Sequence, residues 1–535
     1  MQNFKGRISL FIIAILLASP GMLFAQAPKI EWQKCFGGIY NEGFSSITQT
    51  SDGGFVSVGV KETYTDLEAW IIKLNKSGSI QWQRALPGVI GGDEFYSVTR
   101  TYDKGCIVAG QGFTPCQKSS EDHGGRDFWV IKIDSNGSNE WENCFGGIDY
   151  DYAFSVFQTS DSEYVAAGST VSQSGDVSGY IGQKDYSEDG WIIGINSQGN
   201  LKWQKCLAAY SHYWYPFTTT QSIIQTSDGG FAVAGYAWNM DQAYPQPNAL
   251  PSDAYIGKLD SSRNIVWWTY IGGSKNDIAR SIVQTSNGEL IIAGYTESND
   301  KDVAGNHGGR DAWVVKLNDS GKVIWQKCLG GSGKDQANSI ISLSNGNLLV
   351  AGQTNSTDGD VSSNHGNDDA WLIELDSLGN IQWQKCYGGS SDDVATSLVQ
   401  TFDGGYIFSG TTYSNDGDVS GKHGDMYSTD GWIVKLNFPS YVQEQSTLSQ
   451  TLSLSTFPNP ATNIITLAYD LSKPSSVEIS IYSVTGERMK EIQEASVENG
   501  HHEAALDLSG FPDGTYFISV SACGVTERQM VQLIK

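Results

Sequence analysis

Acidic loops in the second half of this chain carry the side chains best suited to hold a cation. The loop sequences STDGDVSSNHGNDD and SNDGDVSGKHGD place carboxylates at alternate positions, namely Asp358 and Asp360 in the first and Asp416 and Asp418 in the second. Ca²⁺ takes roughly six to eight oxygen ligands, so calcium is the cofactor these loops can bind. Neither loop has the closing glutamate of an EF-hand, and a solvated Gly/Asp turn is the alternative.

Histidine and cysteine spacing argues against a zinc site. One histidine recurs in equivalent loops of four repeat copies, which separates the imidazoles and favours turn positions: His123, His307, His365 and His423. Five cysteines share another repeat position, where we expect small buried apolar groups: Cys35, Cys144, Cys206, Cys328 and Cys386. Cys106 and Cys116 lie within one copy, and both a local disulfide bond and free thiols are compatible with their spacing.

An aromatic insert in the fourth repeat copy is the strongest candidate for ligand binding. Two stretches, LAAYSHYWYPFTTT and AWNMDQAYPQPNALPSD, replace shorter connections that should be neighbours on one face. Their aromatic groups can stack on sugar rings or anchor a protein. The alternative is that the inserts pack on each other and close a wider gap. The predicted ligand-binding residues are His212, Tyr213, Trp214, Tyr215, Trp238 and Tyr244.

A polar side chain also recurs four positions before the serine that opens the first strand of each copy. These positions are Asn41, Asp93, Asp151, Asp277, Asp335 and Asp393, with Thr218 in the fourth copy. A ring of carboxylates for a cation is one interpretation. Because Asn and Thr keep an oxygen acceptor and lose the charge, we favour capping of a turn through backbone N–H groups.

The element that positions these groups is a repeat, represented by residues 277–331. Four short apolar runs end at Gly, Asn, Asp or Ser, and predict strands at 281–285, 290–295, 312–317 and 323–329. Seven copies align on one tryptophan: Trp32, Trp82, Trp141, Trp203, Trp267, Trp325 and Trp383. A second register holds six further tryptophans and Tyr255, so 13 of the 16 tryptophans occupy two repeat positions and are predicted to be core.

The order of the runs predicts how the repeats close. The region opens with a fourth-strand motif and ends with a third strand, so the N-terminal strand can complete the last copy. Such pairing removes both exposed sheet edges. We therefore predict an all-β fold in which residues 28–437 form a seven-bladed β-propeller closed by the N-terminal strand, with an open solenoid as the alternative. The segment GGSKNDIARSIVQTSNGELIIAGYT, followed by GGRDAWVVKL, resembles a bacterial β-propeller repeat family of secreted proteins. The resemblance implies a fold and an extracellular setting but no catalytic residue.

Composition and the leader define the compartment. The formal charge of −25 argues against nucleic acid as a partner. Residues 1–25 read as a cleavable signal peptide, with Lys5 and Arg7 before a short apolar run and Ala25 at the cleavage site. An uncleaved anchor is the alternative, and no second stretch is long enough to predict a transmembrane span in the mature chain.

Residues 438–455 are Ser/Thr/Gln-rich and predict a linker, and alternating strands in 456–535 predict a small Ig-like β-sandwich. The motifs FPNP, IYSVTGE and LSGFPDGTYFI, with the terminal Lys535, resemble the type A C-terminal sorting domain of type IX secretion in Bacteroidetes. This resemblance implies the type IX secretion machinery as a partner, and release or attachment to surface lipopolysaccharide. An accessory domain that stays attached is the alternative.

These observations predict an exported, cell-surface or released propeller that binds a glycan or a protein. No nucleophile elbow, HExxH helix or paired-carboxylate pattern was found in the sequence, which favours binding over catalysis. An extracellular glycan-acting enzyme, a hydrolase or lyase, is the first alternative, and a structural surface component is the second.

Overall fold

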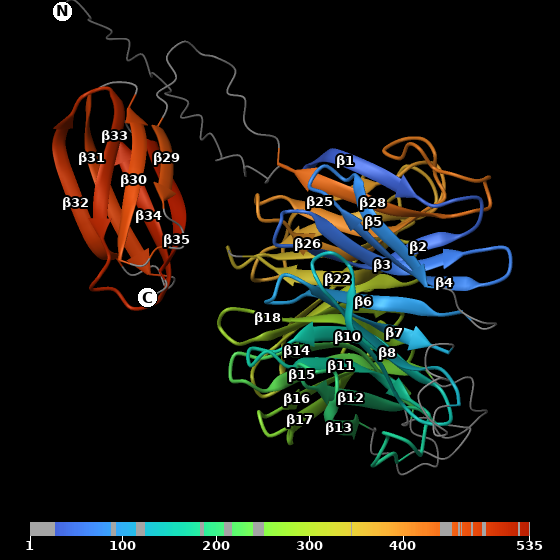
Figure 1. The fold of residues 1–535 in the computed structure, drawn as a ribbon. Coiled ribbons are helices and arrows are strands. Elements are labelled where there is room, and N and C mark those ends of the chain that lie inside the picture. Colours follow the sequence, from blue (N-terminus) through green and yellow to red (C-terminus); the bar gives the residue numbers. More distant parts are fainter. Residues whose placement is uncertain are drawn as a thin grey trace, which may run out of the picture. The chain divides into compact units, whose positions relative to one another are not determined.

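The computed structural model describes residues 27–86, 92–113, 124–181, 187–207, 217–238, 251–343, 345–438, 452–457, 461, 463–471, 474–483, 488–522 and 525–533. Within these ranges every regular element is a strand, which confirms the all-β prediction (Figure 1). None of the described elements is a helix that could cross a membrane. The chain divides into two compact units, Met1–Phe438 and Pro439–Lys535.

The larger unit contains seven four-stranded antiparallel sheets, consistent with propeller blades and numbered here one to seven. Sheets one to three are β2 (Glu42–Gln49), β3 (Phe55–Glu62), β4 (Leu67–Leu74) and β5 (Ile80–Leu86); β6 (Glu94–Arg100), β7 (Cys106–Gly112), β8 (Asp127–Ile133) and β9 (Asn139–Phe145); and β10 (Asp151–Gln158), β11 (Tyr164–Thr170), β12 (Asp189–Ile195) and β13 (Leu201–Leu207).

Sheets four and five are β14 (Thr218–Gln225), β15 (Phe231–Trp238), β16 (Ser252–Leu259) and β17 (Ile265–Ile271); and β18 (Asp277–Gln284), β19 (Leu290–Thr296), β20 (Asp311–Leu317) and β21 (Val323–Leu329). Sheets six and seven are β22 (Asp335–Ser342), β23 (Leu348–Thr354), β24 (Asp369–Leu375) and β25 (Ile381–Tyr387); and β26 (Asp393–Gln400), β27 (Tyr406–Thr412), β28 (Asp430–Asn437) and β1 (Lys29–Phe36).

The first strand of each sheet begins earlier than the apolar pattern predicted. In sheet five, β18 starts at Asp277 instead of Ser281, because residues 277–279 also pair with β19 and Arg280 bulges between them and Ser281. The fourth strand, β21, has the predicted bounds. Polar side chains at the strand start hid the extra pairing from a hydrophobicity pattern.

The tryptophans of the second register are buried, as predicted, whereas those of the first register, apart from Trp383, are half-buried and pack against the core. Trp313 and Trp371 are fully buried, and their indole N–H groups donate to Gln326 and Gln384 on the neighbouring strand at 2.8 Å. In sheet four the equivalent Tyr255 stacks on Trp268, with ring centroids 4.8 Å apart. Trp268, which lies outside the repeat frame, therefore packs on the smaller ring that replaces tryptophan there.

The N-terminal strand joins the last sheet. β1 pairs antiparallel with β28, and Figure 1 draws the blue strand beside the orange one. Trp432 donates its indole N–H to Gln33 at 3.0 Å across this pair. Ring contacts also tie the first and last sheets, because Phe36, Phe44 and Ile407 share one apolar cluster.

We call the first strand of each sheet, from β2 in sheet one to β26 in sheet seven, its inner strand. A serine hydroxyl links successive inner strands, and the same contact recurs between the last sheet and the first. The Ser281 hydroxyl accepts a hydrogen bond from the backbone N–H of Ile340 at 3.3 Å, and Ser222 accepts one from Ile282 at 3.4 Å. The Ser397 hydroxyl of sheet seven accepts one from Ile47 of sheet one at 3.3 Å. Sheets seven and one are thus joined by the same contact that joins their consecutive neighbours.

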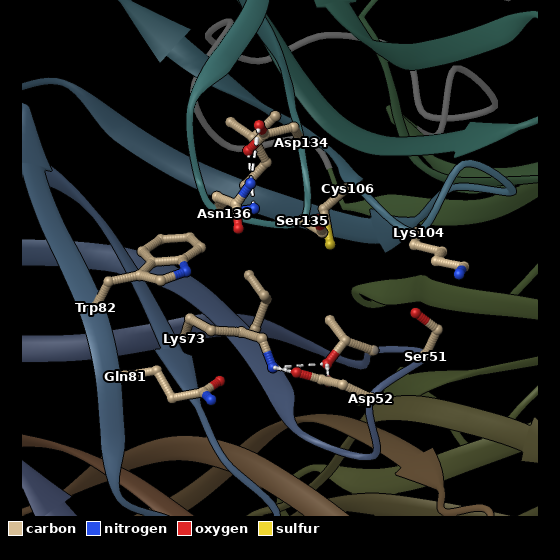
Figure 2. Close-up of a pocket in the computed structure, with 13 residues that line it drawn as sticks. Ser51, Asp52, Lys73, Gln81, Trp82, Lys104, Cys106, Asp134, Ser135 and Asn136 are labelled. Carbon is tan, nitrogen blue, oxygen red and sulfur yellow. Dashed lines mark hydrogen bonds and ion pairs between the residues drawn. The ribbon is translucent and has the colours of Figure 1, made fainter.

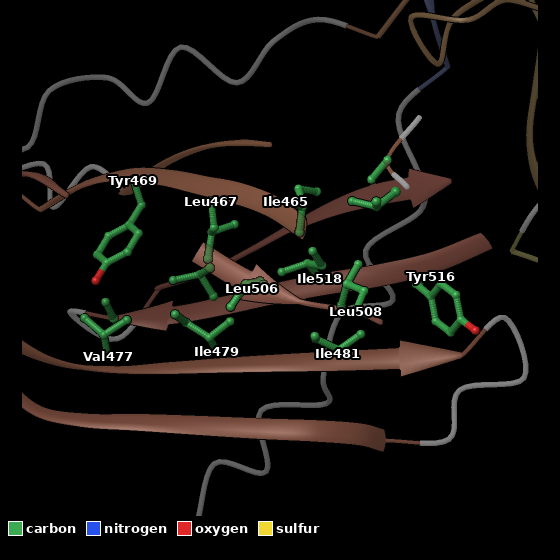
Figure 3. Close-up of a cluster of buried hydrophobic side chains, with 14 of the residues drawn as sticks. Ile465, Leu467, Tyr469, Val477, Ile479, Ile481, Leu506, Leu508, Tyr516 and Ile518 are labelled. Carbon is green, nitrogen blue, oxygen red and sulfur yellow. The ribbon is translucent and has the colours of Figure 1, made fainter. Parts of the chain in front are cut away.

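The smaller unit contains two sheets around one core. One sheet is β29 (Leu452–Phe457), β30 (Ile464–Leu471) and β33 (Gly500–Asp507), and the other is β32 (Arg488–Val497), β31 (Ser475–Ser483), β34 (Gly514–Ala522) and β35 (Val525–Leu533). Figure 3 shows Ile465 and Leu467 of one sheet beside Ile479 and Ile518 of the other, all buried. β29 begins at Leu452, so the predicted linker 438–455 overlaps the first strand by four residues.

Candidate functional site

The polar residue that begins each inner strand acts as a turn cap, as favoured from the sequence. The Asp335 carboxylate accepts hydrogen bonds from the Gly331 N–H and the Ser356 hydroxyl, both at 2.8 Å, and from the Thr354 hydroxyl. The same set surrounds Asp277 and Asp393. In sheet one the pairing places Glu42 at this position, so the assignment of Asn41 was wrong by one residue.

Replacing Asp335 by alanine is expected to lower the free energy of unfolding by about 3 kcal/mol, because it leaves three buried donors without an acceptor. Asp335→Asn, which retains one acceptor oxygen, should cost less. Urea denaturation measures both, with Asp319→Ala on an exposed turn of sheet five as the matched control. Equal midpoints for Asp335→Ala and the control would show that the carboxylate does not stabilise the turn.

The four predicted calcium ligands also hold turns. Asp358 and Asp416 accept backbone N–H bonds from Ser332 and Ser390 at 2.7 and 2.8 Å. Asp360 accepts one from Gly330 at 3.2 Å. The backbone N–H of Asp418 donates to the Gly388 carbonyl, in the turn between sheets six and seven, at 2.8 Å. Among the described residues no three acidic, histidine or cysteine side chains form a metal-binding group. Calcium therefore stays a prediction, and this geometry favours a structural role.

The loop histidines bind aspartates at the start of the third strand. The Nδ1 atoms of His307 and His365 lie 2.7 and 2.6 Å from Asp311 and Asp369. His423 makes the same contact with Asp430 at 2.7 Å. Each imidazole is thus engaged within its own sheet, as the turn interpretation predicted, and His123 lies outside the described residues.

The structure decides one open alternative for the cysteines and corrects one expectation. Cys106 is a free thiol, buried in the core beside Val58 and Trp129, which excludes a disulfide bond to Cys116 and leaves the free-thiol alternative. Cys116 itself lies outside the described residues. Cys144, predicted to be a small apolar group, is disulfide-bonded. Burial raises the pKa of the Cys106 thiol to about 12, so it carries no reactive thiolate.

Only one residue of the predicted aromatic site is described. Trp238 ends β15 and stacks on Phe217, with ring centroids 4.5 Å apart and an interplanar angle of 6°. Tyr236, two residues earlier, lies 6.2 Å from Phe217 by ring centroids. His212, Tyr213, Trp214, Tyr215 and Tyr244 lie outside the described residues and stay predictions.

A pocket of about 440 Å³ lies between sheets one and two, beside the short turns that follow β2 and β6 (Figure 2). Its most prominent charge, the buried Lys73 ammonium, lies 2.9 Å from Asp52 and 2.9 Å from the Thr50 hydroxyl. The same lysine and turn aspartate pair in sheets two, four and seven. The charges in this pocket therefore stabilise the repeat, and do not distinguish a ligand site.

A second cavity, of about 300 Å³, is lined by side chains from the inner strand of every sheet. Each inner strand has a β-bulge before its serine, and each bulge contributes one lining residue, which together are Ser45, Tyr96, Phe154, Gln221, Arg280, Asn338 and Thr396. A bulge re-aims one side chain out of the regular alternation. We call this space the axial cavity.

The axial cavity combines amides, hydroxyls, two aromatic rings and one guanidinium. Gln336 donates to Asn338 at 2.7 Å, and Thr396 donates to the Phe44 carbonyl at 2.7 Å. Tyr96 and Phe154 lie 5.3 Å apart by ring centroids. The lining thus offers hydrogen bonds to a polar ligand and flat apolar surface to a ring.

Two half-buried acids bond residues of the strands that line the cavity. Glu94 accepts a hydrogen bond from Tyr96 at 3.0 Å, and Glu188 accepts one from Thr219 at 3.0 Å. Burial raises the pKa of both carboxyls. Before β20 of sheet five, Arg310 pairs with Glu297 at 3.0 Å. Desolvation therefore holds Glu94 and Glu188 closer to neutrality than exposed acids.

Sequence reasoning missed the axial residues, although a signal was present. In the segments AFS, ARS, ANS and ATS the small residue and the serine are unchanged while the middle residue differs. Variation at one position inside a constant frame points to a residue that the scaffold does not require. Hydrophobic periodicity could not reveal it, because the bulge breaks the two-residue alternation.

Residues 455–533 match a family model described as a secretion system C-terminal sorting domain. This match covers most of the smaller unit and supports export by type IX secretion, to the cell surface or the extracellular space. The bacterial group and the repeat family stay predictions. No curated protein matches the chain.

Among solved structures, the chain is similar to Sqt1 of Chaetomium thermophilum, at 10% identity over 76% of this chain and 98% of that one, with a TM-score of 0.37. Puromycin hydrolase is similar at 10% identity over 80% of this chain and 59% of its own, with a TM-score of 0.42. A Synechocystis apocarotenoid oxygenase variant is similar at 11% identity over 65% of this chain and 72% of its own, with a TM-score of 0.35. At such identities and TM-scores no functional inference follows.

Proposed function

We propose that this protein is an exported binding module for a glycan or a protein, delivered by type IX secretion. The observation that carries the proposal is the axial cavity, in which seven different side chains project from an otherwise repeated frame. Sheet four adds a half-buried aromatic row of Phe217, Tyr236 and Trp238. This row lies beside the predicted aromatic insert of the fourth repeat copy. Aromatic faces beside amides are suited to sugar rings.

In this proposal residues 28–437 form a closed seven-bladed β-propeller, and an Ig-like sandwich in 456–535 carries the sorting signal. Two features support closure, namely the β1–β28 pairing and the Ser397 contact with Ile47. The contribution of all seven sheets to one cavity supports it further. The predicted signal peptide, residues 1–25, lies outside the described residues.

A glycan array probed with the purified protein tests the binding role, with Trp238→Ala as the key variant. We expect the variant to lose about 10-fold or more in affinity, since stacking on one aromatic ring contributes about 1–2 kcal/mol. Tyr102→Ala, an exposed ring on the opposite turn face, is the control and should bind as the parent does. A glycan bound equally by both variants would remove sheet four from the site, and binding of no glycan would leave a protein as the proposed ligand.

A glycan-acting enzyme is the second candidate, favoured by the raised pKa of Glu94 and Glu188. A carboxyl whose pKa is raised holds its proton to higher pH and is better suited to serve as a general acid. Incubation of the protein with polysaccharides, followed by detection of released oligosaccharides, tests this candidate. Product release that Glu94→Gln or Glu188→Gln abolishes would favour catalysis over binding alone.

A further inference from the structure

Among the described residues, Arg280 is the one cation that lines the axial cavity, and no acidic side chain of those residues pairs with it. Arg280 is the bulge residue of β18, and its Nε atom is buried without a hydrogen-bond partner. Its Nη1 atom donates to Asn338 Oδ1 at 3.3 Å, an oxygen that also accepts a shorter bond of 2.7 Å from Gln336. A guanidinium is a rigid fork of five donors, so most of its capacity is unused by the described residues.

The neighbouring acids are engaged elsewhere. Glu297 pairs with Arg310, which lies over the Tyr295 ring at 3.9 Å, whereas Arg280 lies 5.7 Å from the same ring. Glu94 is hydrogen-bonded to Tyr96. Asp368, on the side of sheet six, accepts from Gln353 at 2.9 Å. A desolvated cation without a counter-charge is unfavourable, and burial accordingly lowers the pKa of Arg280.

This arrangement is unusual in a chain whose formal charge is −25. A scaffold role would pair the cation, as the repeated buried lysines are paired with turn aspartates. Arg280 has no counterpart in the other six bulges, which carry uncharged side chains. Because Arg280 is the one charged bulge residue, the cavity favours a ligand of negative charge.

We propose that the axial cavity binds the carboxylate of an acidic sugar, with Arg280 as its bidentate partner. Nε and an Nη group can together donate two parallel bonds to a carboxylate. Gln221 and Ser45 make no side-chain hydrogen bond among the described residues and are available to sugar hydroxyls. Tyr96 and Phe154 supply the apolar face, and about 300 Å³ accommodates one sugar unit. The inference deepens the proposed function, because it names the ligand class within the binding role.

Isothermal titration of the purified protein with glucuronic acid, its methyl ester and glucose tests the assignment. We expect glucuronic acid to bind at least 10-fold more tightly than the ester or glucose. Arg280→Gln should remove this preference and Arg280→Lys should restore part of it, while Arg100→Gln, a residue that contacts Phe402, serves as the control.

Equal binding of the acid, its ester and glucose would overturn the carboxylate assignment and leave the glycan-binding role standing. Binding of none of the three, alongside Trp238-dependent binding on the array, would also overturn it. The ester comparison uses the unaltered protein, so a variant that fails to fold does not remove the test. Acetate that competes as strongly as glucuronic acid would overturn the sugar part of the proposal.

Discussion

A chain that begins at Ile39, and therefore lacks β1, is expected to lose more than about 3 kcal/mol of unfolding free energy, the cost of emptying a single buried aromatic site. Phe36 is 8% exposed, and contacts Phe44 with ring centroids 6.0 Å apart. The Pro28 carbonyl, also removed, accepts a bond from the Tyr387 hydroxyl at 2.7 Å. The loss would expose the edge of β28 to pairing with other chains.

Urea denaturation and size-exclusion chromatography measure this effect, with a chain that begins at Ala27 as the reference. The shortened chain should unfold at lower urea and form aggregates. Adding the peptide Ala27–Gly38 should restore the midpoint, because the seventh sheet still offers the vacated edge. A shortened chain that is monomeric and as stable as the reference would show that β1 does not hold the seventh sheet to the first.

The second large effect is an unusual pH dependence of stability. Burial raises the pKa of Asp151 from 3.8 to about 7, and that of Asp311 and Asp393 to about 6. Between these values and the unfolded pKa the folded state binds more protons than the unfolded chain, so stability falls as pH rises from 4 to 7. At about 1.4 kcal/mol for each pKa unit, Asp151 alone contributes roughly 4 kcal/mol.

Other carboxyls determine how the stability of the folded protein falls at low pH. Hydrogen bonds from Lys258 and Thr226 hold the pKa of Asp228 at about 2. At Asp52, desolvation raises the pKa, but hydrogen bonds from Thr50 and Lys73 outweigh it and hold the pKa at about 2. Their stabilisation is present above the unfolded pKa of 3.8 and is lost as pH falls toward 2. We therefore expect the melting temperature to peak near pH 4–5.

Melting curves of the parent protein and of Asp151→Asn, recorded from about pH 2.5 to 8, measure both limbs. The variant should lose part of the decline between pH 5 and 8 while keeping the acid limb. Asp319→Asn, an exposed turn residue, is the control and should follow the parent. A melting temperature that rises from pH 5 to 8 would contradict the buried-acid explanation.

The sequence predicted the sheets well because their chemistry repeats. In seven copies, a buried Trp or Tyr, an acidic or hydroxyl side chain at the start of the first strand, and a turn rich in Gly, Asp and Asn each report the same local structure, so an error in one copy does not change the count. It predicted less well where the chain departs from alternation. The one-residue error between Asn41 and Glu42 arose because Ser45 and Ser46 are adjacent, and only the pairing of Phe44 with Gly59 shows which of them is the bulge.

The candidate site was harder to predict for a physical reason. Trp238 stands out by residue type, whereas Arg280 and Gln221 are ordinary polar residues until a bulge directs them to one cavity. Their convergence depends on seven strands that are far apart in sequence. The choice between a disulfide bond and a free thiol at Cys106 was undecided for a related reason, since the buried location of its side chain depends on packing between sheets one and two.

The serine after each bulge has a separate consequence. Ser46, Ser222 and Ser281 each bond the backbone of the next sheet, so these sheets are joined beside the bulge residue. In sheets six and seven the bulge residues Asn338 and Thr396 also bond the next sheet. The other five bulge positions, Ser45, Tyr96, Phe154, Gln221 and Arg280, can therefore be randomised together while the atoms that join the sheets stay constant. The fold thus provides a natural library scaffold, in which specificity can be selected at the axis independently of stability at the blade interfaces.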